Sequence, residues 1–249
     1  MSRALILAAG QATRLEGIRD TYAKANVPVG NTTPLRFMLE RLAHAGFNEA
    51  WINLHYLADQ VRSEAERWAP AHLQLHFLEE PQLLGTGGTL LEMVKDCGHL
   101  PDIVVNAKMF TDFDFKLFAN TEANGSDESS GCLVLHPPTL LAVFGGLAFD
   151  ANKEITGLHL RTAKTPEAPH GAAVFTGIAK PDAAWLPFLE QAKAQNDDEP
   201  VCSIRHGLLP AIAAGVSSTK ALLHMGYWKE ISTPERVAQI RAELPDLLS

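Results

Sequence analysis

Residues 3–15 read RALILAAGQATRL, an apolar run that ends in a turn of small residues. The run Arg3–Leu7 predicts a short buried strand, because its interior positions are all apolar and it stops at Ala8-Ala9-Gly10. Small residues after a strand let the backbone approach a phosphate, with successive N–H groups pointing at it. Arg14 adds a guanidinium that can fork onto phosphate oxygens. On these residues alone, a phosphate loop and an ordinary tight turn with a surface arginine are equally favoured.

The stretch from Gly10 to Pro34 has no clean period of either a strand or a helix. Structureless stretches of this length are uncommon in compact domains and are usually functional or disordered. Disorder is disfavoured because the stretch carries several apolar residues: Leu15, Ile18, Val27 and Val29. The sequence therefore predicts a long ordered loop after the first strand.

Strands and helices alternate through the first half of the chain. Strands are predicted at Glu49–Leu54, Leu73–Leu78 and Asp102–Asn106, and helices at Leu35–Ala45, Ala58–Trp68, Gly85 to about Lys95, and Asp114–Ala119. This order predicts βαβ units and a largely parallel sheet, in which ligands lie at the carboxyl ends of the strands. Three elements fall there: the loop after Leu7, the glycine turn after Leu78, and Lys108.

The pattern changes after a polar stretch at Asn120–Gly131, which predicts a mobile loop. Later strands are expected at Cys132–Leu135, Ala142–Phe149, Ala172–Ile178 and Ala221–Met225, and helices at Ala183–Ala194 and Ile204–Ala214. The run Ser232-Thr233-Pro234-Glu235 is typical of a helix start, with a hydroxyl cap and an early proline, and that helix is expected to end near Leu244.

Composition narrows the classes of function. The chain has 249 residues, a formal net charge of −8 and three cysteines without a CxxC pairing. A broad basic surface for nucleic acid, a disulfide framework and a zinc site are therefore not expected. No apolar run approaches the ~18–20 residues of a membrane span, and no signal peptide is recognisable, so we expect a cytoplasmic protein. No oligomeric state follows from these patterns.

Two polar groups are weak site candidates. His72 and His76 share a face of a predicted strand at a spacing that chelates a metal poorly. Glu79 and Glu80 precede a proline and are interpreted as a solvated strand end, with acceptance from a base or sugar hydroxyl as the alternative.

The motifs together resemble one family. Leu7–Leu15 resembles the loop L-A-A-G-x-G-T-R-L of sugar-1-phosphate nucleotidyltransferases, with Ala12 in place of the second glycine. Without a gap, Ala23–Val29 aligns with P-K-P-L-V-P-V and places Lys24 on the lysine of the family, although both flanking prolines are lost. Three later segments also match in order: Leu84–Leu90 with L-G-T-[AG]-G-[AG]-L, Val174–Ile178 with x-x-G-I, and Gly226–Pro234 with G-Y-W-x-D-I-G-T-P.

The resemblance covers the chain from about Arg3 to Arg236 and is greatest to short bacterial members, such as N-acetylmuramate-1-phosphate uridylyltransferases and mannose-1-phosphate guanylyltransferases. It implies a Rossmann-like α/β three-layer sandwich with a mostly parallel mixed sheet. It also implies one domain over residues 1–249, with a nucleotide-binding half at about 1–120 and a sugar-binding half at about 131–249.

The resemblance implies a reaction in which a sugar-1-phosphate oxygen attacks the α-phosphorus of a nucleoside triphosphate and pyrophosphate leaves. Arg14, Lys24 and Lys108 take the catalytic positions. The implied nucleotide-binding residues are Ala8, Ala9, Gly10, Gln11, Ala12, Thr13, Gly85, Thr86, Gly87 and Gly88, and the implied sugar-binding residues are Asn106, Thr176 and Gly177.

One departure from the family concerns the metal. Where the family has N-G-D, with an aspartate that binds Mg²⁺, this chain has Asn106-Ala107-Lys108. The second metal aspartate appears as Glu230, which can still act as a metal ligand. Mg²⁺ prefers oxygen ligands, and an ammonium has no lone pair to offer and repels a divalent ion, so Lys108 opposes Mg²⁺ as a cofactor.

Three interpretations of Lys108 stay open. Lys108 contacts the phosphates and replaces part of the metal's charge; or the chain has lost catalysis and binds a nucleotide or nucleotide-sugar as a regulatory or partner subunit; or Lys108 only forms an ion pair with Glu230 or Asp112. The first interpretation makes the chain a nucleotidyltransferase, and the second is the alternative function.

Overall fold

The computed structural model describes residues 1–119, 131–161, 171–195 and 198–248. The chain forms two compact units that interleave in the sequence: unit 1 holds residues 1–83, 105–120 and 226–249, and unit 2 holds residues 84–104 and 121–225. The segment 84–104 thus folds with the later part of the chain, and the C-terminal segment folds with the earlier part. The polar stretch 120–130, expected to be a mobile loop, lies outside the described residues.

Unit 1 is built on parallel strands. β1 (Arg3–Leu7) pairs with β2 (Glu49–Leu54), and β2 pairs with β3 (Gln74–Glu79), all parallel. The end of β4 (Ile103–Asn106) lies beside β1. The core positions of β1 are fully buried, which agrees with the apolar run that predicted this strand. The sheet therefore brings the carboxyl ends of β1, β2 and β3 to one edge.

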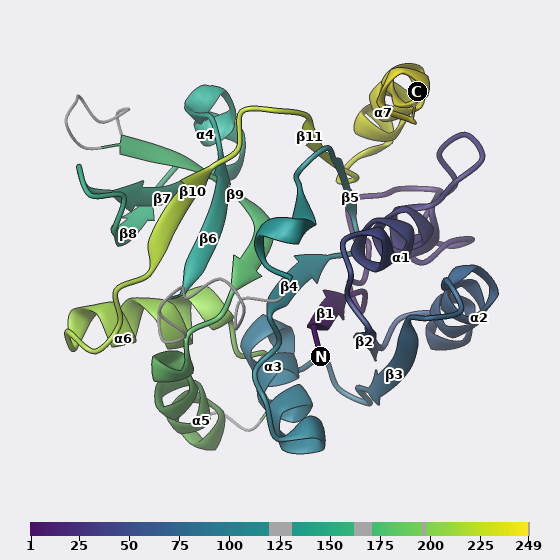
Figure 1. The fold of residues 1–249 in the computed structure, drawn as a ribbon. Coiled ribbons are helices and arrows are strands. Elements are labelled where there is room, and N and C mark those ends of the chain that lie inside the picture. Colours follow the sequence, from purple (N-terminus) through teal and green to yellow (C-terminus); the bar gives the residue numbers. More distant parts are fainter. Residues whose placement is uncertain (120–130, 162–170, 196–197, 249) are drawn as a thin grey trace. The chain divides into compact units, whose positions relative to one another are not determined.

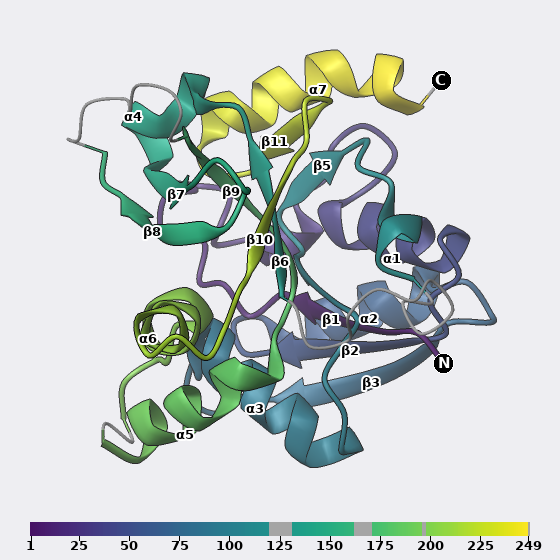
Figure 2. The same ribbon diagram turned by 60° about the vertical axis from the view of Figure 1, so that its left-hand side comes forward.

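Three helices and a two-stranded ribbon complete unit 1. α1 (Pro34–His44) begins after Thr33, whose hydroxyl accepts a hydrogen bond from the Arg36 amide, and lies beside α2 (Ala58–Trp68), as Figure 1 shows. β5 (Met109–Thr111) pairs antiparallel with β11 (Trp228–Glu230). Figure 2 shows α7 (Pro234–Leu248) lying along this ribbon.

The long loop after β1 is ordered by its apolar side chains, as the sequence predicted. Leu15, Val27 and Val29 are fully buried, and Ile18 packs against the same cluster. The cluster also contains Phe37 of α1, Phe110 of β5, Ile231 just after β11, and Val237 and Ile240 of α7. The loop is therefore held by packing on one side, which leaves its polar residues to face outward.

Unit 2 contains a second group of strands. β6 (Cys132–His136) pairs parallel with β10 (Lys220–Leu223) and antiparallel with β9 (Gly171–Lys180). β7 (Gly146–Phe149) pairs with both β8 (Ile155–His159) and β9. The helices are α3 (Gly85–Cys97), α4 (Leu141–Phe144), α5 (Leu186–Gln195) and α6 (Leu209–Ala213).

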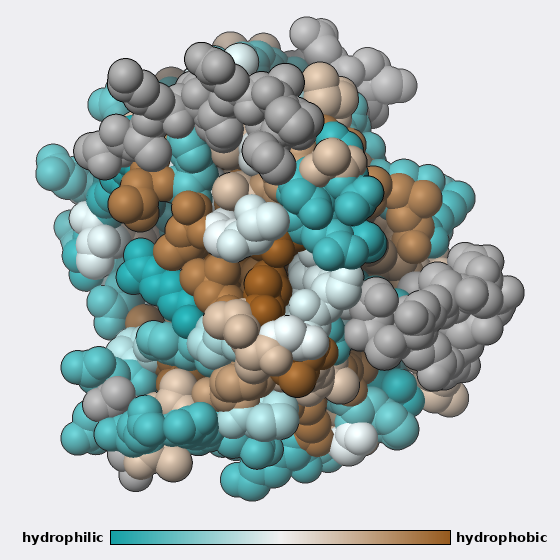
Figure 3. Space-filling view, turned by 90° about the vertical axis from the view of Figure 1, so that its left-hand side faces the viewer, coloured by the Kyte–Doolittle hydropathy of each residue, from teal (hydrophilic) through white to brown (hydrophobic). Residues whose placement is uncertain are grey.

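Unit 2 also exposes apolar side chains. Figure 3 shows apolar residues gathered at the centre of the face that carries β7, β8 and β10. The exposed large apolar residues of unit 2 are Val143, Leu158, Leu160, Val216, Leu223 and Met225.

The elements confirm the α/β class expected from the sequence, with a mixed, mostly parallel sheet flanked by helices. The helix predicted at Asp114–Ala119 is only a 3₁₀ turn at Phe115–Leu117, and the last helix ends at Leu248 and not near Leu244. Two other predicted elements are divided in the structure. Residues 142–149 are not one strand, because the chain turns at Gly145 (φ 67°) and so divides α4 from β7. Residues 204–214 are not one α-helix, because a π-helical turn at Ser203–Leu208 precedes α6. Among the described residues, no helix has both the length and the apolar character needed to cross a membrane.

Gly85 is required at the start of α3 by both its backbone conformation and its surroundings. Its φ is +76°, and a Cβ on it would lie 2.6 Å from the carbonyl oxygen of Val201. We expect Gly85→Ala to lower the free energy of unfolding by about 3 kcal/mol, since backbone strain and overpacking add. Gly98 ends the same helix at φ +75° with open space around it, so Gly98→Ala is the control and is expected to lose only about 1 kcal/mol. Equal losses in urea unfolding would show that the contact with Val201 has no part in the effect.

Candidate functional site

The loop after β1 is fixed to the sheet by one asparagine. Asn53, near the end of β2, accepts hydrogen bonds from the amides of Ala8 (2.6 Å) and Ala9 (3.2 Å) through Oδ1. Its Nδ2 donates to the buried carboxylate of Glu80 at 2.8 Å. The amides of Ala8 and Ala9, predicted to face a phosphate, have an internal partner in this structure and hold the turn in place.

The outward side of the loop is formed by Gly10, Gln11, Thr13 and Arg14, which are exposed. Between them, Ala12 is buried at φ 54°, a conformation that a glycine adopts without strain. Alanine occupies the position of a family glycine and adopts the same left-handed conformation, at a strain of about 1 kcal/mol. The loop then presents polar groups and a guanidinium outward while Ala12 packs inward.

Gln60 of α2 positions the segment that carries Lys24. Its side chain accepts a hydrogen bond from the Ala23 amide (2.8 Å) and donates one to the carbonyl of Thr21 (2.9 Å). Its carbonyl accepts from the Asn26 side chain at 2.8 Å. The short 3₁₀ turn Lys24–Asn26 is thereby clamped from both sides. Lys24 itself is half-buried in this turn.

The electrostatics of Lys24 are unusual for a lysine. Burial, together with the charges of Lys108 and Arg14 and against the opposing charge of Glu230, lowers the pKa of its ammonium to about 8. A cation that is partly removed from water and faces two other cations is stabilised by any anion that binds beside it. These charge effects put Lys24 within electrostatic range of Arg14 and Lys108. Their shared role toward a phosphate stays a prediction.

The β5–β11 ribbon places Lys108 against Glu230. Glu230 is opposite Met109 in the antiparallel register, and the amide of Ile231 donates to the carbonyl of Lys108 at 2.7 Å. Across this contact the Lys108 ammonium lies 2.6 Å from Glu230 Oε2, with the lysine side chain 30% and the glutamate side chain 7% exposed. The ion pair with Glu230, one of the three interpretations of Lys108, is thus present.

The charge of Glu230 is stabilised by its neighbours. Burial raises its pKa, but the ion pair and hydrogen bond with Lys108, together with the charges of Lys24 and Arg14, outweigh burial and hold the pKa below its usual value. Three cations therefore surround one carboxylate. The cluster of Arg14, Lys24, Lys108 and Glu230, which we call the cation cluster, lies wholly in unit 1 and has an excess of positive charge.

The residues of this cluster do not fit Mg²⁺. The ion prefers an octahedron of oxygen ligands, and proteins commonly supply one or two carboxylates for it. Here Glu230 is paired with an ammonium, and the other members of the cluster are cations. No group of three or more histidine, cysteine, aspartate or glutamate side chains in the described part of the chain has the arrangement to hold a metal.

The glycine turn at residues 85–88 packs against its own unit. The Gly87 amide donates to the carbonyl of Val201 at 2.7 Å, and the Thr86 hydroxyl contacts the Ser203 hydroxyl at 3.0 Å. Gly87 and Gly88 are buried, whereas Gly85 and Thr86 are partly exposed. These contacts give the turn a structural role in unit 2, and its role toward a nucleotide base stays a prediction.

The residues expected to face a sugar lie in different units. Thr176 and Gly177 are buried in β9 of unit 2, where the Thr176 hydroxyl donates to the carbonyl of Val134 at 2.7 Å. Asn106 is half-buried at the end of β4 in unit 1. A direct sugar contact by these three residues stays a prediction.

Two supporting residues were missed from the sequence. Asn53 is a polar residue near the end of an otherwise apolar strand, which is a signal for a buried hydrogen-bonding role. The expectation that Glu80 is solvated is wrong, because it is 3% exposed and bonded to Asn53, whereas Glu79 is exposed and pairs with Arg62. Gln60 lies on a helix face rich in charged residues, so its sequence position did not indicate a supporting role.

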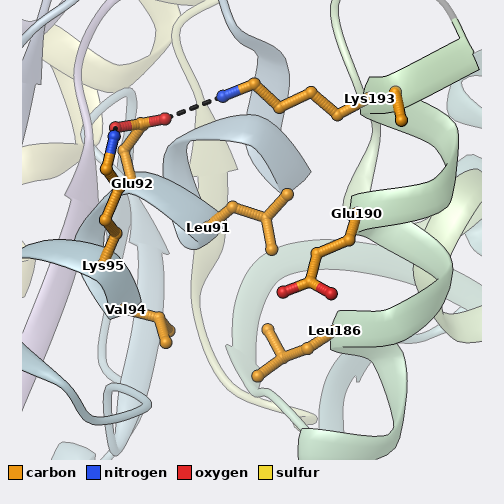
Figure 4. A pocket seen from close by; sticks show the side chains of 8 residues that line it. Leu91, Glu92, Val94, Lys95, Leu186, Glu190 and Lys193 are labelled. Carbon is orange, nitrogen blue, oxygen red and sulfur yellow. Dashed lines mark hydrogen bonds and ion pairs between the residues drawn. The ribbon is translucent and has the colours of Figure 1, made fainter.

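A groove of about 510 Å³ lies elsewhere, between α3 and α5 of unit 2. Figure 4 shows Glu92 held between Lys193 and Lys95, with apolar side chains below them. The groove contains none of the residues predicted for the site. Its lining residues are Leu91, Glu92, Val94, Lys95, Leu186, Glu190, Lys193 and Ala194.

Comparison with known proteins shows relatives of one kind. An N-acetylmuramate alpha-1-phosphate uridylyltransferase from Neisseria meningitidis serogroup B is 30% identical over 139 residues, 55% of this chain and 60% of that protein. A mannose-1-phosphate guanylyltransferase catalytic subunit beta from Drosophila melanogaster is 29% identical over 154 residues, 61% of this chain and 41% of that protein. The chain thus matches less than two thirds of the length of these curated relatives.

Solved structures share the fold. HddC from Yersinia pseudotuberculosis, whose structure is also known in complex with GMP-PN, superposes with a TM-score of 0.73 at 20% identity, over 98% of this chain and 100% of that chain. A putative glucose-1-phosphate thymidylyltransferase from Bacillus anthracis gives a TM-score of 0.74 at 17% identity, over 99% of this chain and 96% of that chain. The sequence model of the nucleotidyl transferase family matches residues 3–174. With the loop, the lysine and the strand order in place over that range, the chain belongs to the nucleotidyl transferase family.

Proposed function

We propose that this protein joins a nucleoside triphosphate to a sugar-1-phosphate and releases pyrophosphate. The observation that carries the proposal is the cation cluster, which gathers Arg14, Lys24 and Lys108 around one carboxylate next to the loop that follows β1. Family membership and the names of the relatives support the same reaction. A cluster with surplus positive charge stabilises phosphate groups and the charge that develops during their transfer.

In the proposed reaction each cation has one task. Arg14 holds the triphosphate through its exposed guanidinium, and the exposed residues Gly10, Gln11 and Thr13 line the same phosphates. Lys24, fixed by Gln60, bridges the α-phosphate and the incoming sugar phosphate. Catalysis then comes from alignment of the two phosphates and from stabilisation of charge, as in other phosphoryl transfers. The turn at 85–88 is assigned to the base, and Asn106, Thr176 and Gly177 to the sugar side.

A panel assay tests the proposal. Each of the common nucleoside triphosphates is combined with N-acetylmuramate-, mannose-, glucose- and heptose-1-phosphate, with and without Mg²⁺, and both pyrophosphate and the nucleotide-sugar are measured. We expect both products from at least one pair, and neither product from the Lys24→Met variant above background. Tight binding of a nucleotide or nucleotide-sugar without any product would instead support the alternative, a catalytically inactive homologue that acts as a regulatory or partner subunit. This second candidate is favoured by the Lys108 ammonium on Glu230, at the position where the family binds a metal.

Arg14 is expected to matter for ligand binding and little for folding. Its side chain is exposed, whereas the loop is held by Leu15 and by Asn53. Arg14→Ala should weaken triphosphate binding about 10-fold or more, because it removes a charge-assisted contact, and change the free energy of unfolding by less than about 1 kcal/mol. Calorimetry and urea unfolding measure the two effects. An unchanged affinity would remove Arg14 from the site, and a large loss of stability would make its role structural.

The lowered pKa of Lys24 predicts how binding depends on pH. Its ammonium is charged below a pKa of about 8 and becomes neutral above it, so an anion that needs the charge binds less well as pH rises. Phosphate monoesters lose their second proton near pH ~6, so the ligand itself is constant in this range. We expect about a 10-fold loss of triphosphate affinity between roughly pH 7.5 and 9. Lys24→Arg keeps its charge throughout and should show a flat profile. The same slope in both proteins would contradict the assignment.

A further inference from the structure

We propose that this phosphate site works without a bound divalent cation, because the ammonium of Lys108 is the built-in positive charge at the position where the family holds a metal. The inference rests on the proposed function and concerns how the same site stabilises phosphate. It starts from the disagreement between the residues present and the ligand set of Mg²⁺. Lys108 stands where the family has a carboxylate ligand, and its ammonium pairs with Glu230, the carboxylate that is left.

Glu230 is already engaged by Lys108. Its carboxylate lies 2.6 Å from the Lys108 ammonium and is almost fully buried. The strand register fixes both residues, since β11 and β5 pair directly beside them. A divalent ion that approached Glu230 would have to displace the Lys108 ammonium from that carboxylate. The same ion would come close to the charges of Lys24 and Arg14.

The Lys108 ammonium keeps N–H donors for a ligand. An ammonium carries three N–H donors, of which Glu230 Oε2 accepts one. The Lys108 side chain is 30% exposed, whereas Glu230 is buried beneath it, so part of the lysine is open to a ligand. Lys108 is therefore held on a carboxylate, as a metal ion would be, while its side chain stays partly exposed. Glu230 is the positioning residue and Lys108 the group that meets phosphate.

The proposed reaction develops negative charge on the leaving group. A non-bridging oxygen of the sugar phosphate forms a bond to the α-phosphorus, and the bond from that phosphorus to the oxygen of the β-phosphate breaks. The leaving oxygen keeps the electron pair and departs on pyrophosphate, and no proton is transferred. The step needs only positive charge to meet the negative charge that grows on the leaving group. Fixed ammonium and guanidinium groups supply such charge without reorganisation.

The test uses inorganic tripolyphosphate, which carries the charge of a triphosphate without a base. Its affinity is measured by calorimetry in EDTA and in excess Mg²⁺, for the wild type and for Lys108→Met. Mg²⁺ neutralises the ligand, so we expect the wild type to bind about 10-fold more tightly in EDTA than in Mg²⁺. Lys108→Met should lose this preference and bind about 10-fold less tightly in EDTA. Lys108→Asp should reverse it and bind only with Mg²⁺, because it restores a carboxylate beside Glu230.

Two controls complete the design. Lys229 lies on the same ribbon but points to the other side of β11, where it pairs with Glu243, so Lys229→Met should behave as the wild type. If Lys108→Met does not fold, Lys108→Met/Glu230→Gln removes the same cation without stranding a buried charge, and it should show the same loss of preference. Tighter binding by the wild type in Mg²⁺, an unchanged affinity in Lys108→Met, or no binding in either condition would each overturn the inference. Failure of the panel assay alone would reject the transferase activity and leave this result standing.

Discussion

Lys108→Met is expected to lower the free energy of unfolding by about 3 kcal/mol at neutral pH, since it leaves the Glu230 carboxylate buried without its partner. Breaking a buried ion pair by removing one partner has this effect because the remaining charge has lost both water and its counter-ion. The half-buried neighbour Lys24 compensates only in part, because burial disfavours its own charged form. Urea unfolding measures the change.

A double-mutant cycle assigns the loss to the pair. Lys108→Met/Glu230→Gln removes both charges, so it should recover most of the stability that the single variant loses. Lys229→Met, which breaks a more exposed pair on the same ribbon, should change stability by less than about 1 kcal/mol. Because the pKa of Glu230 is lowered in the fold, its contribution is present above its unfolded pKa and disappears as pH falls through the lowered value. A cycle with no coupling between positions 108 and 230 would show that the ion pair adds nothing.

Lys24→Met is expected to act in opposite directions on stability and on turnover. The pKa of Lys24 is lowered to about 8, so at pH 7 the fold holds a charge that its surroundings disfavour. Methionine has a similar length and no charge, so the free energy of unfolding should rise by about 2 kcal/mol. Nucleotidyl transfer should fall about 100-fold or more, because a preorganised cation at the transferred phosphate is lost.

The pH dependence separates this effect from simple repacking. Between about pH 8 and 10.5 the unfolded chain keeps a proton that folded Lys24 has released, so the stability of the wild type gains a contribution that increases with pH. The variant lacks that group and should lack that increase. Stability curves from urea unfolding at several pH values, together with pyrophosphate release, make the comparison. A variant that loses both stability and activity would place Lys24 in a structural role.

The local elements of this fold follow closely from the sequence. The strand Glu49–Leu54 and the helix Ala58–Trp68 were predicted with the observed ends, because an apolar run and a charged helical face are strong local signals. The loop from Gly10 to Pro34 was predicted to be ordered because it carries apolar residues, and these residues form a cluster with α1, β5 and α7. The local pattern of apolar residues was sufficient to predict an element where its period matched the face that the fold buries.

The site was harder to predict, because it depends on contacts between distant parts of the chain. The ribbon strands Met109–Thr111 and Trp228–Glu230 have three residues each, too few for a recognisable alternation, so the sequence left Glu230 and Asp112 as equal partners for Lys108. Asn53 and Gln60 support the loop through hydrogen bonds across 34 or more residues, which no local spacing announces. Gly145 and the π-helical turn at 203–208 similarly changed elements that had a uniform apolar pattern.

A crystal structure with a non-hydrolysable nucleoside triphosphate, grown in the presence of Mn²⁺, tests the central claim most directly. Manganese is located by its anomalous scattering, so the positions of phosphate and metal are read independently. The account predicts the triphosphate against Arg14, Lys24 and Lys108, the Lys108 ammonium still on Glu230, and no manganese on Glu230. A triphosphate bound away from these cations, or manganese on Glu230 with Lys108 displaced, would contradict it.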